Sequence, residues 1–325
     1  MEKEKLLILD GNSLMFRAFY ALPLLTNNEG LHTNAVYGFS TMLLKMKEEI
    51  KPDYIVAAFD RKAPTFRHIE YKDYKAGRKK MPPELSEQMP VVKELLNLLA
   101  INIFEIDGFE ADDLIGTLSK FAEKKGIEVY IVTGDRDALQ LASDNIHIVI
   151  NKKGMTEKEV YDEDRMVKEL GVTPTQFIDV KALMGDNSDN IPGVPGIGPK
   201  TAFKLISEYK SIENVFENID KLKGKMKSNL IEYREQAFFS KKLATIVTNV
   251  PIEIDLNSIE SRDDFDAEGV RQLFYKLQFN SLLEKIPELR KDQTAEDIKV
   301  EYKIINKIDE LKKLKDYIKN IIFVS

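Results

Sequence analysis

The chain has 325 residues, 43% of them hydrophobic, which is enough for a large core and for more than one folding unit. It contains no cysteine, which excludes disulfides and thiolate metal sites. Its histidines, His32, His68 and His147, share no ligand spacing, so any metal is expected to be bound by oxygen, which favours Mg²⁺ or Mn²⁺. The net charge of −6, taken alone, argues against a nucleic-acid partner. No apolar run approaches the ~20 residues needed to cross a membrane, so we expect a cytoplasmic protein without a membrane partner.

Strand-like and helical patterns alternate over residues 5 to about 150. Short apolar runs rich in Ile, Val and Leu predict strands near 5–9, 54–59, 101–106, 128–133 and 146–150. Apolar residues at helical spacing predict helices within 37–50, 90–100 and 113–126. This alternation favours the α/β class, with helices packed on a mainly parallel sheet.

Acidic residues stand at or just after the ends of these apolar runs. The members of this set are Asp10, Asp60, Glu110, Asp112, Asp113, Asp135 and Asp137. Because ligands bind outside the carboxyl ends of parallel strands, these carboxylates are expected to converge on one crevice. Converging negative charges require cations, so the set predicts a multi-metal site. Each residue alone also fits an ordinary strand end or helix N-terminus.

A basic segment, residues 61–83, interrupts the alternation directly after Asp60. Its cations are Arg61, Lys62, Arg67, Lys72, Lys75, Arg78, Lys79 and Lys80, and its aromatic residues are Phe66, Tyr71 and Tyr74. Beside a metal cluster, such a segment would steer a phosphodiester and neutralise charge developing on it. Tyr71 and Tyr74 fit either base stacking or core packing, and the whole segment also fits a solvated charged loop. Arg17, in a stretch otherwise expected to be core, is a further candidate for phosphate contact.

Helical patterns dominate from about 160 to 290, and they include one glycine-rich turn. The stretch GDNSDNIPGVPGIGPK contains Asp186, Asp189, Gly193, Gly196, Gly198 and Lys200. A glycine turn that leads into a helix N-terminus offers backbone N–H groups to a phosphate, although an ordinary helix–turn–helix corner has the same spacing. The neighbouring acids, which also fit plain turn residues, favour binding of a nucleic-acid backbone.

The chain resembles the 5′ nuclease domain at the N-terminus of bacterial DNA polymerase I, within the flap endonuclease superfamily. The motifs that carry the resemblance are ILDGNSLMFRAFYALP, FDRKAPTFRHIEYKDYKAGR, GFEADD, TGDRDALQL and MGDNSDNIPGVPGIGPKTA. The resemblance covers about residues 1–290. It implies a PIN-like catalytic region over 1–175 with a helical arch at about 61–90, and a helical, helix–hairpin–helix-type DNA-binding region over 176–290. We expect residues 291–325 to be a linker and the truncated start of a 3′–5′ exonuclease-like domain, without proofreading or polymerase activity.

The same resemblance implies a set of site residues and cofactors. The family's metal-binding acids match Asp10, Asp60, Glu110, Asp112, Asp113, Asp135, Asp137, Asp186 and Asp189. Its basic arch residues match Arg67, Lys75 and Arg78, and its helix–hairpin–helix turn matches Gly196, Gly198 and Lys200. The implied cofactors are two or more Mg²⁺ ions, with Mn²⁺ as the alternative, and K⁺ at the glycine turn.

We therefore expect a metal-dependent 5′–3′ exonuclease and structure-specific 5′ flap endonuclease, acting as a monomer on branched, 5′-flapped and RNA-primed DNA in replication and repair. Lys75, Arg78 and Arg67 are the expected catalytic cations, and Arg17, Tyr74 and Lys79 are expected to contact DNA. One alternative is a non-catalytic module that binds branched DNA. A closer alternative is a free-standing 5′–3′ exonuclease that never carried a polymerase.

Overall fold

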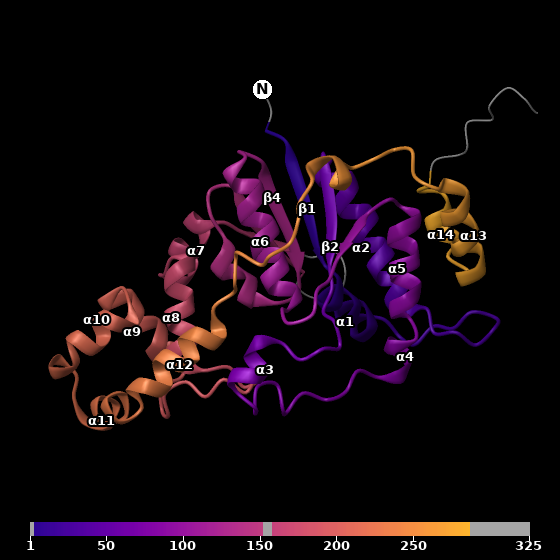
Figure 1. The fold of residues 1–325 in the computed structure, drawn as a ribbon. Coiled ribbons are helices and arrows are strands. Elements are labelled where there is room, and N and C mark those ends of the chain that lie inside the picture. The colour runs from indigo at the N-terminus through magenta and orange to yellow at the C-terminus, as the bar shows by residue number, and fades with distance from the viewer. Residues whose placement is uncertain (1–2, 152–157, 287–325) are drawn as a thin grey trace, which may run out of the picture. The chain divides into compact units, whose positions relative to one another are not determined.

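Residues 3–151 and 158–286 are described by a computed structural model of the chain, drawn in Figure 1. They belong to one unit, Met1–Pro287, and the linker and domain start predicted for 291–325 lie outside the described residues. The strands are β1 (Lys5–Asp10), β2 (Tyr54–Ala58), β3 (Asn102–Phe104), β4 (Glu128–Thr133), β5 (Ile146–Asn151) and β6 (Lys158–Tyr161).

The helices are distributed along the whole described chain. Those of the first half are α1 (Gly11–Ala21), α2 (Asn34–Ile50), α3 (Phe66–Glu70), α4 (Pro83–Ser86), α5 (Met89–Leu98), α6 (Ala111–Lys124) and the 3₁₀ helix η1 (Arg136–Leu141). Those of the second half are α7 (Glu163–Leu170), α8 (Pro174–Met184), α9 (Pro199–Tyr209), α10 (Ile212–Glu217), η2 (Ile219–Lys221), α11 (Gly224–Glu232), α12 (Arg234–Ala244), η3 (Leu256–Ile259), α13 (Ala267–Leu277) and α14 (Asn280–Leu283).

The six strands form one sheet in the order β3-β2-β1-β4-β5-β6. All neighbouring pairs are parallel except β5 and β6, which are antiparallel. From β1 the chain adds β2 and β3 on one side of the sheet, and later places β4 and β5 on the other. The strand order therefore reverses between β1 and β4, and this switch point is where an open parallel sheet forms its ligand crevice.

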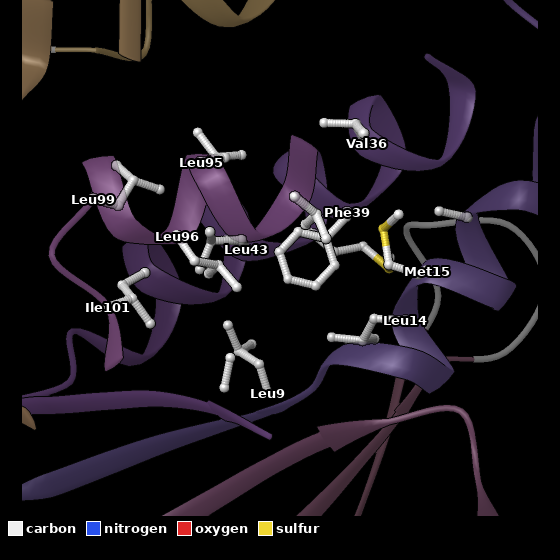
Figure 2. Packing of buried hydrophobic residues seen from close by; sticks show 14 of the residues in the cluster. Leu9, Leu14, Met15, Val36, Phe39, Leu43, Leu95, Leu96, Leu99 and Ile101 are labelled. Carbon is white, nitrogen blue, oxygen red and sulfur yellow. The ribbon is translucent and has the colours of Figure 1, made fainter. Parts of the chain in front are cut away.

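Alternate residues of the central strands enter two separate cores, because successive side chains of a strand point to opposite faces. Leu7 and Leu9 pack with α1, α2 and α5 on one face. Figure 2 shows Leu9 among the residues packed around Phe39. Leu6 and Ile8 pack with α6 and η1 on the other face. Because both faces are covered, β1 is almost entirely apolar until Asp10, which explains why its sequence reads as an unbroken apolar run.

Two glycines lock the end of α8 against the glycine-rich turn that follows it. Gly185 has a left-handed φ of 71°, and a Cβ there would lie 2.5 Å from the Ile191 carbonyl oxygen. Gly193 has a φ of 61°, and a Cβ there would lie 2.3 Å from the Gly185 nitrogen. The two backbone segments approach so closely that only glycine fits at either position. This contact fixes the position of Asp186, which follows directly.

The expected α/β class and mainly parallel sheet are confirmed, with each predicted strand found within a few residues of its expected bounds. The antiparallel edge strand β6 was not predicted. Within the helical patterns expected from about 160 to 290, the stretch 224–244 is divided by a break at Tyr233, which separates α11 from α12. The expected arch, 61–90, holds only short helices and turns, namely α3, α4 and the first residues of α5.

The chain returns to the sheet after α12. Ile246, Val250 and Ile259 join the core on the α6 face, and α13 and α14 join the core around α2 and α5. The expected helical region 176–290 therefore contributes to both cores of the α/β layer. The division of the chain into 1–175 and 176–290 stays a prediction. Among the described residues, none of the helices has the length and apolar character needed to cross a bilayer.

We expect Gly185→Ala to destabilise the protein more than Gly126→Ala. Both glycines have positive φ, so each alanine costs about 1–2 kcal/mol of left-handed strain. Only Gly185 has backbone atoms within reach of the new methyl group, which adds about 1–3 kcal/mol for the overlap. The free energy of unfolding in urea measures both. Equal losses in the two variants would contradict the interlock of Gly185 with Gly193.

Candidate metal and nucleic-acid site

The crevice at the switch point is organised around Asp10, which ends β1 and is the N-cap of α1. Its carboxylate accepts hydrogen bonds from the Ser13 N–H at 3.0 Å and from the Thr133 hydroxyl at 2.6 Å. Thr133 is the last residue of β4, so this bond joins the two strands where their connections diverge. Asp10 is consequently buried, with 3% of its surface exposed.

Five carboxylates line a cavity of about 150 Å³ at this crevice. Glu110 is paired with Lys75, and we call the other four, Asp10, Asp60, Asp112 and Asp135, the first carboxylate group. Asp60 follows β2 and accepts a hydrogen bond at 2.8 Å from the N–H of Ala111, the first residue of α6. Asp112 lies in the first turn of α6, and Asp135 is the N-cap of η1. The ends of three strands and the start of one helix thus deliver acids to one cavity.

The first carboxylate group carries negative charge that its surroundings balance poorly. Burial raises the pKa of Asp10 to about 7, and the charges of Asp60 and Asp135 add to this effect. Burial and then the charges of Asp10, Asp135 and Asp60 raise the pKa of Asp112 well above its usual value, although Lys75 opposes them. A divalent cation would relieve this repulsion, and a donor set made of carboxylate oxygens fits Mg²⁺ or Mn²⁺.

Asp137 and Asp186 form a second carboxylate group, and a lysine lies between them. Lys181, in the last turn of α8, places its Nζ 2.7 Å from Asp137 Oδ1 and in contact with Asp186 Oδ2. The pKa of Asp186 lies below its usual value: burial acts to raise it, but hydrogen bonds from Lys181 and Ser188 outweigh the effect of burial. Burial and the charge of Asp135 raise the pKa of Asp137 to about 6 against the opposing effect of Lys181.

Part of the basic segment folds back over the crevice. Lys75 Nζ lies 2.7 Å from Glu110 Oε1 and 3.8 Å from Asp189 Oδ2, and Arg78 contacts Asp189 as well. Both cations line the cavity of the first carboxylate group. Tyr74 is 3% exposed, and its hydroxyl lies 3.1 Å from Glu110 and 3.0 Å from Asp189. Its ring has no exposed face on which a base could stack, which argues against the DNA contact expected for Tyr74.

Arg67 is the most deeply buried cation of the basic segment, with 2% of its surface exposed. Its guanidinium donates to both oxygens of Asp113, at 2.7 and 2.8 Å, and to the Thr245 carbonyl at 2.8 Å. Asp113 is fully buried and also accepts from the Val247 N–H at 2.9 Å. The pair therefore ties α3 to α6 and to the chain after α12. Neither residue lines the cavity of the first carboxylate group. This position argues against the catalytic role expected for Arg67 and the metal-binding role expected for Asp113.

The predicted backbone-binding residues lie on the surface. Gly196, with a φ of 80°, and Gly198, the N-cap of α9, are exposed, as is Lys200 in the first turn of that helix. The Asn229 amide donates to the Pro195 carbonyl at 2.6 Å and so fastens α11 to this turn. Arg17 is half-buried in α1, and Lys79 is exposed near the end of the basic segment.

Cations interleave with several of the predicted metal ligands. Within residues 3–151 and 158–286, no three acidic or histidine side chains close on one point as a ready-made metal cage. Lys75 forms an ion pair with Glu110, Arg78 forms one with Asp189, and Lys181 forms ion pairs with the second carboxylate group. Sequence reasoning missed Lys181, and its only signal is a single lysine inside the otherwise apolar stretch VKALM. It also missed Thr133, whose hydroxyl at a strand end has no distinguishing pattern.

Comparison with protein families assigns the chain. A profile described as the N-terminal resolvase-like domain of 5′–3′ exonucleases matches residues 5–171. The chain belongs to the 5′–3′ exonuclease family. A second profile of this family, described as its C-terminal SAM fold, matches residues 172–267.

Bacterial DNA polymerases I are similar to this member of the 5′–3′ exonuclease family. DNA polymerase I of Bacillus subtilis (strain 168) is 50% identical over 304 residues, which are 92% of this chain and 34% of that protein. DNA polymerase I of Bacillus caldotenax is 46% identical over 309 residues, which are 95% of this chain and 35% of that protein. The chain thus spans about a third of the length of these relatives. The resemblance expected from the motifs is confirmed.

Solved structures support the fold. T5 5′-exonuclease, solved with bound divalent metal ions (zinc), matches with a TM-score of 0.63 and 23% identity over 84% of this chain and 100% of its own. Flap endonuclease-1 from Methanococcus jannaschii matches with a TM-score of 0.53 and 18% identity over 87% of this chain and 91% of its own. At these identities the similarity concerns the fold alone, and it confirms the PIN-like architecture.

We expect Arg67→Met to cost about 3–5 kcal/mol of unfolding free energy, because it leaves the Asp113 charge buried and unpaired. The matched control is Arg61→Met, which breaks the exposed pair with Asp107 at 3.2 Å and is expected to cost less than about 1 kcal/mol. Urea unfolding measures both losses. If the two variants were equally stable, the Arg67–Asp113 tie would not hold the basic segment in place.

We expect the metal-free protein to lose stability as pH rises through the titration of Asp10. The folded pKa of about 7 exceeds the unfolded value of ~3.9, so the folded state binds this proton more tightly and is destabilised between these two pH values. The unfolding free energy of Asp10→Asn minus that of the parent should therefore rise by more than about 1.4 kcal/mol between pH 4.5 and 8. The rise for Asp10→Asn should exceed that for the control Glu29→Gln, which changes an exposed acid. A constant difference for Asp10→Asn would show that Asp10 titrates normally.

Proposed function

We propose that this chain is a 5′–3′ exonuclease and structure-specific 5′ flap endonuclease that hydrolyses phosphodiester bonds with divalent metal ions. One observation carries the proposal: the first carboxylate group lies at the switch-point crevice with unbalanced negative charge, and Lys75 and Arg78 line the same cavity. Carboxylates that bind metal and cations that bind phosphate together suit metal-assisted phosphodiester hydrolysis. Membership in the 5′–3′ exonuclease family supports the same activity.

The first carboxylate group is proposed to hold one divalent ion, Mg²⁺ or Mn²⁺, and the second group to take part in binding another. Bound ions would supply Lewis-acid stabilisation of the phosphate oxygens during an in-line displacement by water. The protein's own contribution is to fix the ligands. Thr133 and Ser13 orient Asp10, and the N–H of Ala111 orients Asp60. Such outer hydrogen bonds hold ligands in place before an ion arrives.

Lys75 and Arg78 are proposed to stabilise negative charge on the phosphate. Each well-placed donor of this kind typically contributes about 3 kcal/mol to the transition state. Glu110 and Asp189 contact these cations at the rim of the cavity. We propose that both acids position Lys75 and Arg78, and the metal-binding role expected for them from sequence stays a prediction, since Glu110 lines the same cavity.

The glycine-rich turn with Gly196, Gly198 and Lys200 is proposed to bind the backbone of duplex DNA, with K⁺ there as a further expectation. Contacts of this kind position a duplex without reading its sequence. We add Arg17 and Lys79 to the proposed DNA contacts. The proposed substrates are branched, 5′-flapped and RNA-primed DNA, bound by a monomer in the cytoplasm during replication and repair. The similarity to DNA polymerase I supports the further proposal that the chain is the nuclease part of such a protein.

A non-catalytic module that binds branched DNA is the alternative from another class. Binding alone gives no reason to gather five carboxylates in one cavity, because they repel a phosphate backbone until cations balance them. Flap binding without cleavage in Mg²⁺ and in Mn²⁺ would favour this alternative.

We expect the parent chain to cleave a 5′-flap substrate in Mg²⁺, and Asp112→Ala combined with Asp135→Ala to cleave at least about a hundredfold more slowly, because charge stabilisation at the phosphate is lost. Chelation of the metal should abolish cleavage by the parent. The matched control combines Glu29→Ala with Asp220→Ala, two exposed acids outside the cavity. Flap binding, measured by fluorescence anisotropy in Ca²⁺, separates loss of chemistry from loss of affinity. Parent-like cleavage by the Asp112/Asp135 double variant would refute the metal assignment.

A further inference from the structure

The two carboxylate groups of the site differ in how their charge is balanced. In the first group, the contacts to Asp10 and Asp60 described above come from neutral donors, namely backbone N–H groups and the Thr133 hydroxyl. In the second group, a full positive charge is in direct contact with both acids. A neutral donor orients a carboxylate without reducing its charge, whereas a lysine ammonium supplies the charge that a metal ion would otherwise bring.

Lys181 is held where it stands. It is 6% exposed, and it lies in the last turn of α8, directly ahead of the Gly185–Gly193 interlock. The other oxygen of Asp186, Oδ1, accepts from the Ser188 N–H at 2.7 Å and from the Ser188 hydroxyl at 2.6 Å. Both oxygens of Asp186 are therefore engaged, one by Lys181 and one by Ser188, before any ion arrives.

A lysine between two carboxylates also occurs elsewhere in this chain, which provides a comparison. Lys241 Nζ lies 2.7 Å from Asp179 Oδ1 and 2.8 Å from Glu213 Oε1, and this contact joins α12 to α8 and α10. Lys241 therefore has an evident structural purpose. Lys181 likewise joins α8 to Asp137 of η1, but Asp137 lies two residues after Asp135 of the first carboxylate group.

We propose that Lys181 is a built-in cation of the second carboxylate group, which makes the two groups bind divalent ions with unequal affinity. The first group binds an ion directly, whereas the second binds one only when Lys181 Nζ leaves Asp137 and Asp186. This inference rests on the proposed function, since it concerns ions that the proposed hydrolysis requires. It makes Lys181 a positioning residue that sets the affinity for the second ion.

The test is a titration of the metal-stripped full chain with Mn²⁺ in the absence of DNA, with free Mn²⁺ followed by electron paramagnetic resonance. The parent should show one tight and one weak class of site. In Lys181→Met the weak class should tighten at least about tenfold, because the ion no longer has to displace a positive charge from Asp137 and Asp186. Lys181→Arg keeps the charge and should keep the weak class.

The matched control is Lys241→Met, which removes the other lysine between two carboxylates and should leave both Mn²⁺ affinities unchanged. Thermal melting gives a second readout: without metal, Lys181→Met should melt below the parent, and Mn²⁺ should raise its melting temperature more than that of the parent. If Lys181→Met does not fold without metal, Lys181→Gln removes the same charge with a polar side chain.

The outcomes separate this inference from the function on which it rests. Two equal Mn²⁺ affinities in the parent, or a Lys181→Met titration identical to that of the parent, would overturn the role of Lys181 while leaving a metal-dependent nuclease intact. A similar tightening in Lys241→Met would also overturn it, because the effect would then be one of overall charge. Absence of Mn²⁺ binding to the parent would overturn the proposed function, and this inference with it.

Discussion

Mutual repulsion among the carboxylates at the carboxyl ends of β1, β2 and β4 is the constraint on which the rest of the site depends. The strand order places these ends together, and packing on both faces of the sheet keeps Asp10 out of water. Burial and like charge both disfavour the ionised form, so the group is stable only with protons or cations. The sheet thus gathers negative charge that cations from other parts of the chain, or bound ions, must balance.

The chain balances that charge partly with its own cations, which come from two kinds of structure. Lys181 comes from a helix whose end is fixed by backbone contact, so the fold itself places a positive charge at the second carboxylate group. Lys75 and Arg78 come from a segment of turns that is tied down behind the site by Arg67. Because Glu110 and Asp189 contact these two cations, ion pairs with the acids beneath it help to fix the conformation of this part of the basic segment.

The sheet and the first carboxylate group could be predicted from sequence because both depend on local pattern. An apolar run that ends in Asp10 places an acid at a strand end whatever the distant context. The roles of the basic residues depend on tertiary structure. Arg67 and Arg78 belong to the same basic segment, yet one is buried against Asp113 and the other lines the cavity. Lys181 could not be predicted, since its two partners come from separate segments that only the fold brings together.

The return of the chain to the sheet after α12 also has a consequence for biosynthesis. Val270, Phe274 and Phe279 cover apolar side chains of α2 and α5, and the Asp266 N–H bonds to the Leu98 carbonyl at 3.0 Å. Those helices are translated long before their cover exists, and such delayed, long-range pairing slows folding and exposes apolar surface. A nascent chain shorter than about 286 residues would leave this apolar face uncovered, so the core around α2 and α5 is complete only once α14 has been synthesised.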